Sequence, residues 1–108
     1  MIRLVYFSTA MSDIQRPDVE RIAETARVAN QARGITGALA YNGRNFCQCL
    51  EGEEADVRSL MAEISKDQRH SGVKIIDEKP IEQRHFGEWH MQLVDGLDFS
   101  PVIEAMKA

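Results

Sequence analysis

Four polar side chains occupy positions that the hydrophobic pattern of this sequence would otherwise give to a core. Tyr6 and Ser8 share one face of an alternating N-terminal segment, and Gln48 shares a face with Phe46 in a second segment. Asn30 lies on the apolar stripe of a helical segment, about three turns after its start. A buried amide without a partner costs ~1–3 kcal/mol, so each of these side chains needs a hydrogen bond.

Two interpretations of this set are open. Taken one at a time, each side chain is most simply satisfied by nearby backbone or lies at the end of its element. Taken together, a phenol, two amides and a hydroxyl on one covered face would suit a planar heterocycle, because amides pair with an imide-like N–H and C=O edge.

Other kinds of chemistry find no support in the sequence. No serine, cysteine or histidine lies in a recognisable nucleophile motif, and the histidine segments lack the spacing of metal ligands. Gly34 and Gly37 follow a helix, whereas a dinucleotide-binding fingerprint follows a strand. An enzyme of the acylphosphatase kind would need an anion-binding loop, but the segment from Thr9 to Arg16 contains no glycine. We therefore predict a binding module that is not an enzyme.

The elements that position these residues follow from hydrophobic periodicity. Alternation predicts strands over residues 2–9, 36–41, 45–51, 73–77 and 86–94, and Asn42-Gly43 predicts a hairpin turn between the second and third. A helical period predicts one helix from Pro17 to a stop at Gly34 and another over residues 54–65. A short amphipathic helix is expected to follow Ser100.

The order of these elements predicts an α+β fold with a ferredoxin-like βαββαββ topology. We expect a five-stranded mixed sheet with two helices on one face, and a short C-terminal helix. In this fold the first and third strands are central neighbours. That arrangement would place Tyr6 beside Gln48, with Asn30 above both.

Composition limits the class of protein further. A chain of 108 residues with 44% hydrophobic residues is one domain with a modest core. The net charge of −4 argues against a nucleic-acid partner, and no stretch approaches the ~20 apolar residues of a membrane span. The N-terminus reads as a strand rather than a signal peptide, so we expect a cytoplasmic protein with Cys47 and Cys49 as reduced thiols.

Five segments of the chain resemble, in order, the motifs of the BLUF family of blue-light sensors. They are Leu4-Val5-Tyr6-Phe7-Ser8; Asn30 followed by Gly34-Ile35-Thr36-Gly37; Phe46-Cys47-Gln48-Cys49-Leu50-Glu51-Gly52; Asp67-Gln68-Arg69-His70; and Arg84-His85-Phe86-Gly87-Glu88-Trp89-His90-Met91. Each motif alone is weak, but five in register across nearly the whole chain are specific.

The resemblance implies a flavin held noncovalently between the two helices, usually FAD, with FMN and riboflavin as alternatives. It also implies that Tyr6 is the light-driven electron and proton donor. Gln48 would bridge Tyr6 to the flavin N5 and C4=O, and Asn30 would hold the C4=O and N3–H edge. The implied lining is completed by Ser8, Ile22, Phe46, Ile64, Asp67, Arg69, His70, Trp89 and Met91, and whether Trp89 points in or out is left open.

Two positions depart from the commoner family pattern. Ala29 stands where many members have asparagine or histidine beside the flavin. Glu63 stands where some members have a basic residue near the flavin C2=O. We expect Arg69 to supply the missing positive charge.

The resemblance also implies a photosensory domain over residues 1–95 and a short helical tail over residues 96–108. Its output would pass to a partner protein or a second copy, through the sheet face that the two helices leave uncovered. We expect that face to contain Val5, Phe7, Cys47 and Cys49, with Val102, Ile103 and Met106 of the tail at the contact. The alternative is a non-photoactive ferredoxin-like regulator that binds another small ligand.

Overall fold

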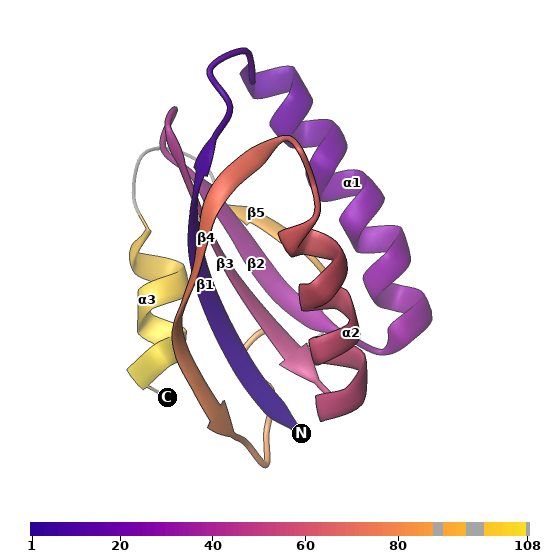
Figure 1. The fold of residues 1–108 in the computed structure, drawn as a ribbon. Coiled ribbons are helices and arrows are strands. Elements are labelled where there is room, and N and C mark those ends of the chain that lie inside the picture. Colours follow the sequence, from indigo (N-terminus) through magenta and orange to yellow (C-terminus); the bar gives the residue numbers. More distant parts are fainter. Residues whose placement is uncertain (88–89, 95–98, 108) are drawn as a thin grey trace.

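The computed structural model describes residues 1–87, 90–94 and 99–107. Along the chain run eight elements, labelled in Figure 1: β1 (Ile2–Ala10), α1 (Arg16–Arg33), β2 (Thr36–Tyr41), β3 (Asn45–Gly52), α2 (Glu54–Ser65), β4 (His70–Pro80), β5 (Gln92–Val94) and α3 (Ser100–Lys107). The α+β class is confirmed, with four antiparallel strands and three helices.

The sheet has the strand order β4-β1-β3-β2-β5, and its last pair, β2 with β5, is parallel. β1 and β3 are therefore neighbours in the middle of the sheet. Their register places Tyr6 directly opposite Gln48, as the sequence predicts. Gly37 of β2 allows the close approach of the next strand, because a Cβ there would lie 1.9 Å from the carbonyl oxygen of Cys49.

The ends of α1 have clear local causes. Pro17 lies in its first turn, and the backbone N–H of Gln15 donates to Asp18 Oδ2 at 2.8 Å. Gly34 ends the helix in the left-handed conformation, with φ of 67°. Asn30 thus lies in the last turn of a well-defined helix, above the central strands.

The predicted fifth strand is wrong in extent. Of the residues that the structure describes in this stretch, only Gln92–Val94 form a strand, and Phe86 and Gly87 lie in a bend and a turn. The reason is that the backbone N–H groups of His85 and Phe86 donate to the carboxylate of Glu51 and not to a neighbouring strand. β4, in contrast, is longer than predicted, because its polar residues lie on an edge strand where both faces are partly exposed.

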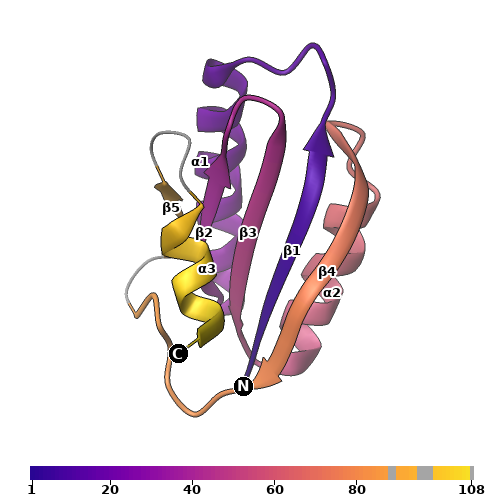
Figure 2. The same ribbon diagram turned by 90° about the vertical axis from the view of Figure 1, so that its left-hand side faces the viewer.

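The helices cover both faces of the sheet. α1 and α2 pack on one face, and α3 packs on the opposite face (Figures 1 and 2). Val102 of α3 is completely buried against a second core that includes Val5, Cys47 and Cys49. Phe7 is partly buried there, and its ring contacts Phe99 edge to face.

This packing corrects the expectation that the second face is uncovered. Val102 packs within its own chain, so it cannot be at an intermolecular contact in this arrangement. Ile103 is half-buried, and the side chain of Met106 lies outside the part that the structure describes. In the part of the chain that the structure describes, every helix is too short or too polar to span a bilayer.

Candidate functional site

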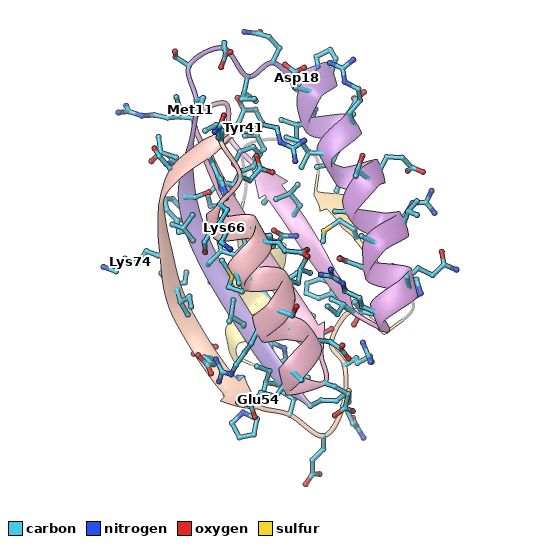
Figure 3. All side chains as sticks on the ribbon, turned by 45° about the vertical axis from the view of Figure 1, so that its right-hand side comes forward. Met11, Asp18, Tyr41, Glu54, Lys66 and Lys74 are labelled. Carbon is cyan, nitrogen blue, oxygen red and sulfur yellow. The ribbon has the colours of Figure 1, made fainter. Side chains whose placement is uncertain are left out.

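A cavity of about 220 Å³ lies between α1 and α2 and the strands beneath them. Figure 3 views the molecule from the side of these two helices. The cavity is lined from α1 by Ile22, Thr25, Ala26, Ala29 and Asn30, from the strands by Tyr6, Leu39, Phe46, Gln48 and His70, from α2 by Leu60, Glu63 and Ile64, and from the following turn by Asp67 and Arg69.

The floor of the cavity is a hydrogen-bonded pair on the central strands. The Tyr6 hydroxyl donates to Gln48 Oε1, and Gln48 Nε2 donates to Met91 Sδ at 3.5 Å. Tyr6 is 3% exposed and Gln48 is 5% exposed. Burial, followed by the nearby Asp67 and Cys47, raises the pKa of Tyr6 well above its usual range. The phenol therefore stays neutral and keeps a proton that it can give up.

The wall above this pair carries an acceptor without a partner. Asn30 Nδ2 donates to the backbone carbonyl of His90 at 2.8 Å. A carbonyl can only accept, so this contact fixes the amide orientation and leaves Oδ1 as the second group of Asn30. Oδ1 is buried and has no hydrogen-bond partner among the residues that the structure describes. A bound N–H donor would satisfy it.

One end of the cavity is fixed by His70, the first residue of β4. Its Nε2 lies 2.7 Å from the carbonyl oxygen of Ile64, which can only accept, so Nε2 carries a proton. In the neutral ring Nδ1 then accepts from the hydroxyl of Ser8 at 2.7 Å. The ring also meets Tyr6 and Phe46 edge to face, with centroids 6.1 Å apart in each case. His70 thus joins β1, β4 and the end of α2.

The rim of the cavity carries two acid–base pairs. Glu63 of α2 accepts from Arg33 of α1 at 2.9 Å and 3.0 Å, which links the two helices. Asp67 accepts from the guanidinium of Arg69. The pKa of Glu63 is lowered by its hydrogen bond to Arg33, and the pKa of Asp67 is lowered by its hydrogen bond to Arg69. Each positive charge at the rim is therefore offset by a carboxylate.

Nine of the twelve residues expected at the site line this cavity. They are Tyr6, Ile22, Asn30, Phe46, Gln48, Ile64, Asp67, Arg69 and His70. Ser8 and Met91 lie behind the lining and bond to His70 and Gln48. Trp89 lies outside the described residues, so its inward or outward position stays open.

Four lining residues were missed by the sequence reasoning: Thr25, Ala26, Leu39 and Leu60. Ala26 and Leu60 lie one helical turn from Ile22 and Ile64, which the sequence reasoning did name, so the helical period could have found them. Thr25 carries no such signal, because it is exposed on α1 next to the stripe.

The residues present fit a flavin ring. The cavity has apolar walls, a phenol and amide on its floor, and an acceptor in need of an N–H donor. This donor and acceptor set matches a planar heterocycle whose edge carries N–H beside C=O. The described residues contain no group of three or more side chains that could hold a metal ion.

Comparisons with known proteins agree with this geometry. The family model for BLUF, sensors of blue-light using FAD, matches residues 1–92. The photoactivated adenylate cyclase subunit alpha of Euglena gracilis is 34% identical over 109 residues, which cover 96% of this chain and 11% of that protein. The chain therefore spans about a tenth of the length of this curated relative.

Two solved structures are also similar. The dark-state structure of BlrB, a BLUF protein, is 36% identical with a TM-score of 0.82, and the match covers 86% of this chain and 70% of that chain. Klebsiella pneumoniae BlrP1 with FMN and cyclic diGMP is 34% identical with a TM-score of 0.81, and the match covers 87% of this chain and 25% of that chain.

Proposed function

The chain belongs to the BLUF family of sensors of blue light using FAD, and from this premise we propose how its own residues sense light. The observation that carries the proposal is the Tyr6–Gln48 hydrogen bond on the floor of a cavity that fits a flavin ring. The module holds the flavin noncovalently, with Tyr6 and Gln48 as the photochemical pair.

The first event concerns the proton of Tyr6. When bound, a flavin supplies blue-light absorption and an oxidising excited state. Tyr6 is the oxidisable side chain on the cavity floor, and an oxidised phenol is a strong acid. Its hydroxyl proton already points at Gln48 Oε1, so the hydrogen bond defines where that proton goes.

The second event is a change of state at Gln48. In the resting arrangement its oxygen faces Tyr6 and its nitrogen faces Met91. Rotation of the amide would exchange these two atoms, and tautomerisation would change which of them donates. Either change alters the contact with Met91, which lies directly before β5.

The other cavity residues hold and orient the ring. We propose that Asn30 Oδ1 accepts from the flavin imide N–H, since this buried oxygen has no hydrogen-bond partner in the part of the chain that the structure describes. Ile22, Phe46 and Ile64 provide apolar walls. Ser8 and His70 brace the Tyr6 end, and Met91 and Trp89 relay the state of Gln48.

We propose FAD as the cofactor, with FMN and riboflavin as alternatives. The family description supports FAD, and the Klebsiella relative was solved with FMN. Since Asp67 and Glu63 neutralise Arg69 and Arg33 at the rim, the described lining favours the ring over a phosphate tail. Arg69 consequently does not bring an uncompensated positive charge.

The finer architecture and role are proposed on the same basis. We propose a ferredoxin-like βαββαββ domain over residues 1–95 with a five-stranded mixed sheet, supported by the strand order and the parallel β5. We propose that residues 96–108 form its tail, which contains α3 (Ser100–Lys107). The module acts as a sensor without enzymatic activity of its own, and buried reduced thiols at Cys47 and Cys49 support a cytoplasmic location.

The output passes to another domain, protein or copy of the chain. The adenylate cyclase subunit from Euglena is much longer than this module, which supports an effector as the recipient. We propose that the signal leaves through β5 and the surface around α3, because Gln48 contacts Met91 directly before that strand.

The test is the light response of Gln48→Leu. This change removes both amide groups, so the purified protein should remain yellow but lose the red shift of its absorption under blue light. Gln31→Leu is the matched control, since Gln31 is exposed on α1 and does not line the cavity. A normal, reversible shift in Gln48→Leu would refute the mechanism.

A further inference from the structure

A buried carboxylate lies outside the cavity, on the α3 side of the sheet. Glu51 of β3 is completely buried, and both of its carboxylate oxygens are hydrogen-bonded. Oε2 accepts from Arg3 Nε at 2.9 Å and from the backbone N–H of His85 at 2.6 Å. Oε1 accepts from the backbone N–H of Phe86 at 2.9 Å and from the Thr36 hydroxyl at 3.2 Å.

These donors come from β1, from β2 and from the connection between β4 and β5. Arg84 of the same connection adds two bonds, from Nη1 to Thr36 Oγ1 at 2.9 Å and to the backbone carbonyl of Glu51 at 3.0 Å. Hydrogen bonds to an ionised carboxylate are about twice as strong as neutral ones. We call Glu51, Arg3, Thr36 and residues 84–86 the carboxylate clamp, since together they fix the connection to β3.

After the carboxylate clamp the chain crosses to the cavity side of the sheet. Phe86 belongs to the core beneath α3, whereas Met91 belongs to the core beneath α1 and α2. His90 is fixed on the way, because its Nδ1 donates to the Ile35 carbonyl at 2.9 Å and its own carbonyl accepts from Asn30. The described residues before and after positions 88–89 are thus anchored on opposite faces of the sheet.

β3 holds both ends of this crossing. Gln48 donates to Met91 Sδ, and Glu51 binds the start of the connection. The two side chains point to opposite faces, since they are an odd number of positions apart, and they lie about 10 Å apart along one strand. Two side chains of one strand thus contact both described ends of the connection, at residues 85–86 and at Met91.

We propose that Glu51 is a positioning residue, which holds Met91 against the amide of Gln48 through the β4–β5 connection. The inference builds on the proposed function, because the Gln48–Met91 contact is part of the light response there. Glu51→Asp is the informative variant. It keeps the negative charge near Arg3 but withdraws the carboxylate by one methylene, away from the N–H groups of His85 and Phe86.

The first experiment needs no light. Methyl-¹³C methionine spectra of the flavin-bound chain are recorded in the dark, and the Met91 signal is identified by its loss in Met91→Leu. Glu51→Asp should shift or broaden the Met91 signal and leave that of Met11, in the loop before α1, unchanged. Arg27→Gln is the control, because Arg27 is exposed and pairs with Glu24 of its own helix α1, which contributes no residue to the clamp. An unchanged Met91 signal in Glu51→Asp overturns the inference.

The second experiment is a double-mutant cycle on the rate of dark recovery. Glu51→Asp should change this rate about threefold or more in the wild-type background, and should have no further effect in Met91→Leu. An equal change in both backgrounds means that Glu51 acts independently of Met91, which refutes the inference.

The variants also separate this inference from the proposed function. A wild-type chain that binds flavin but shows no light response contradicts the proposed function, while the methyl spectra still decide the role of Glu51. If Glu51→Asp fails to fold, Arg84→Gln replaces it in both experiments. That change removes the two outer bonds of the carboxylate clamp and leaves the Glu51 carboxylate and Arg3 in place.

Discussion

Replacing Asn30 by leucine should weaken flavin binding without weakening the fold. The side-chain amide of Asn30 donates to the His90 carbonyl, while its Oδ1 is buried without a partner among the described residues. In the proposed complex this oxygen accepts from the ring N–H. In Asn30→Leu the ring would bury that N–H unpaired, which costs ~1–3 kcal/mol.

This cost corresponds to a dissociation constant that rises about 5- to 150-fold. The free protein responds differently. Leucine removes the bond to His90, but it also removes the unsatisfied oxygen and adds apolar surface to an apolar wall. These changes oppose each other, so the free energy of unfolding of the flavin-free chain should change by only ~1 kcal/mol or less.

The assay is titration of flavin-free protein with riboflavin, which carries the ring without phosphates, followed by quenching of its fluorescence. Urea unfolding of the same samples gives the stability. Gln31→Leu serves as control, because Gln31 is the exposed neighbour of Asn30 on α1. A dissociation constant within about twofold of wild type, in a folded Asn30→Leu chain, would show that Oδ1 does not hold the ring.

Three further outcomes are expected. Tyr6→Phe should raise flavin fluorescence and abolish photocycling, because it removes the phenol hydroxyl that donates to Gln48 Oε1. An unchanged fluorescence lifetime would show that Tyr6 is not the quencher. Val102→Asp should place an unpaired charge in the core beneath α3, displace that helix and speed the reaction of Cys47 with a thiol reagent. An unchanged reaction rate would mean that α3 stays docked over Cys47. The free energy of unfolding should fall as pH rises from about 8.5 to 11, by up to ~1.4 kcal/mol per pH unit for each thiol. The reason is that burial raises the pKa of Cys47 to about 11, so the thiol loses its proton at lower pH in the unfolded chain than in the folded one. Cys47→Val should reduce that slope in urea unfolding measured across this range, and an identical slope would contradict the cause.

The sequence predicts the floor of the cavity well. Strand alternation decides which face Tyr6 and Gln48 share, and the Asn42-Gly43 turn fixes the hairpin that carries Gln48. The central position of β1 and β3 then follows from the element order. The exact pairing of Tyr6 with Gln48 does not follow from these rules, because a slip of two residues would keep both side chains on the same face.

The β4–β5 connection could not be predicted in the same way. Phe86 looks like the start of a strand, because Trp89, Met91 and Leu93 follow it in the sequence. Its backbone N–H is taken by Glu51, a residue distant in sequence, and no local pattern reports such a contact. Arg3 and Glu51 are charged, so alternation alone would favour solvent exposure for both, whereas the structure buries them as a pair.

The surface that α3 covers could not be predicted from the sequence, for a related reason. A helix of two turns has an apolar stripe but no sequence signal for the surface that it covers. Val102 finds a complementary surface at Val5 and the two cysteines, and this match becomes visible only when the sheet is formed.

The cavity also has a consequence for how much folded protein a cell can hold. A pocket of about 220 Å³ leaves its apolar lining without packing partners until a ligand fills it. Domains of this size are commonly stable by only ~5–15 kcal/mol. A ligand that fills the void stabilises the folded chain in proportion to the logarithm of its concentration. We therefore expect the abundance of this module to follow the supply of its ligand, so that cells poor in flavin lose the protein as well as its response.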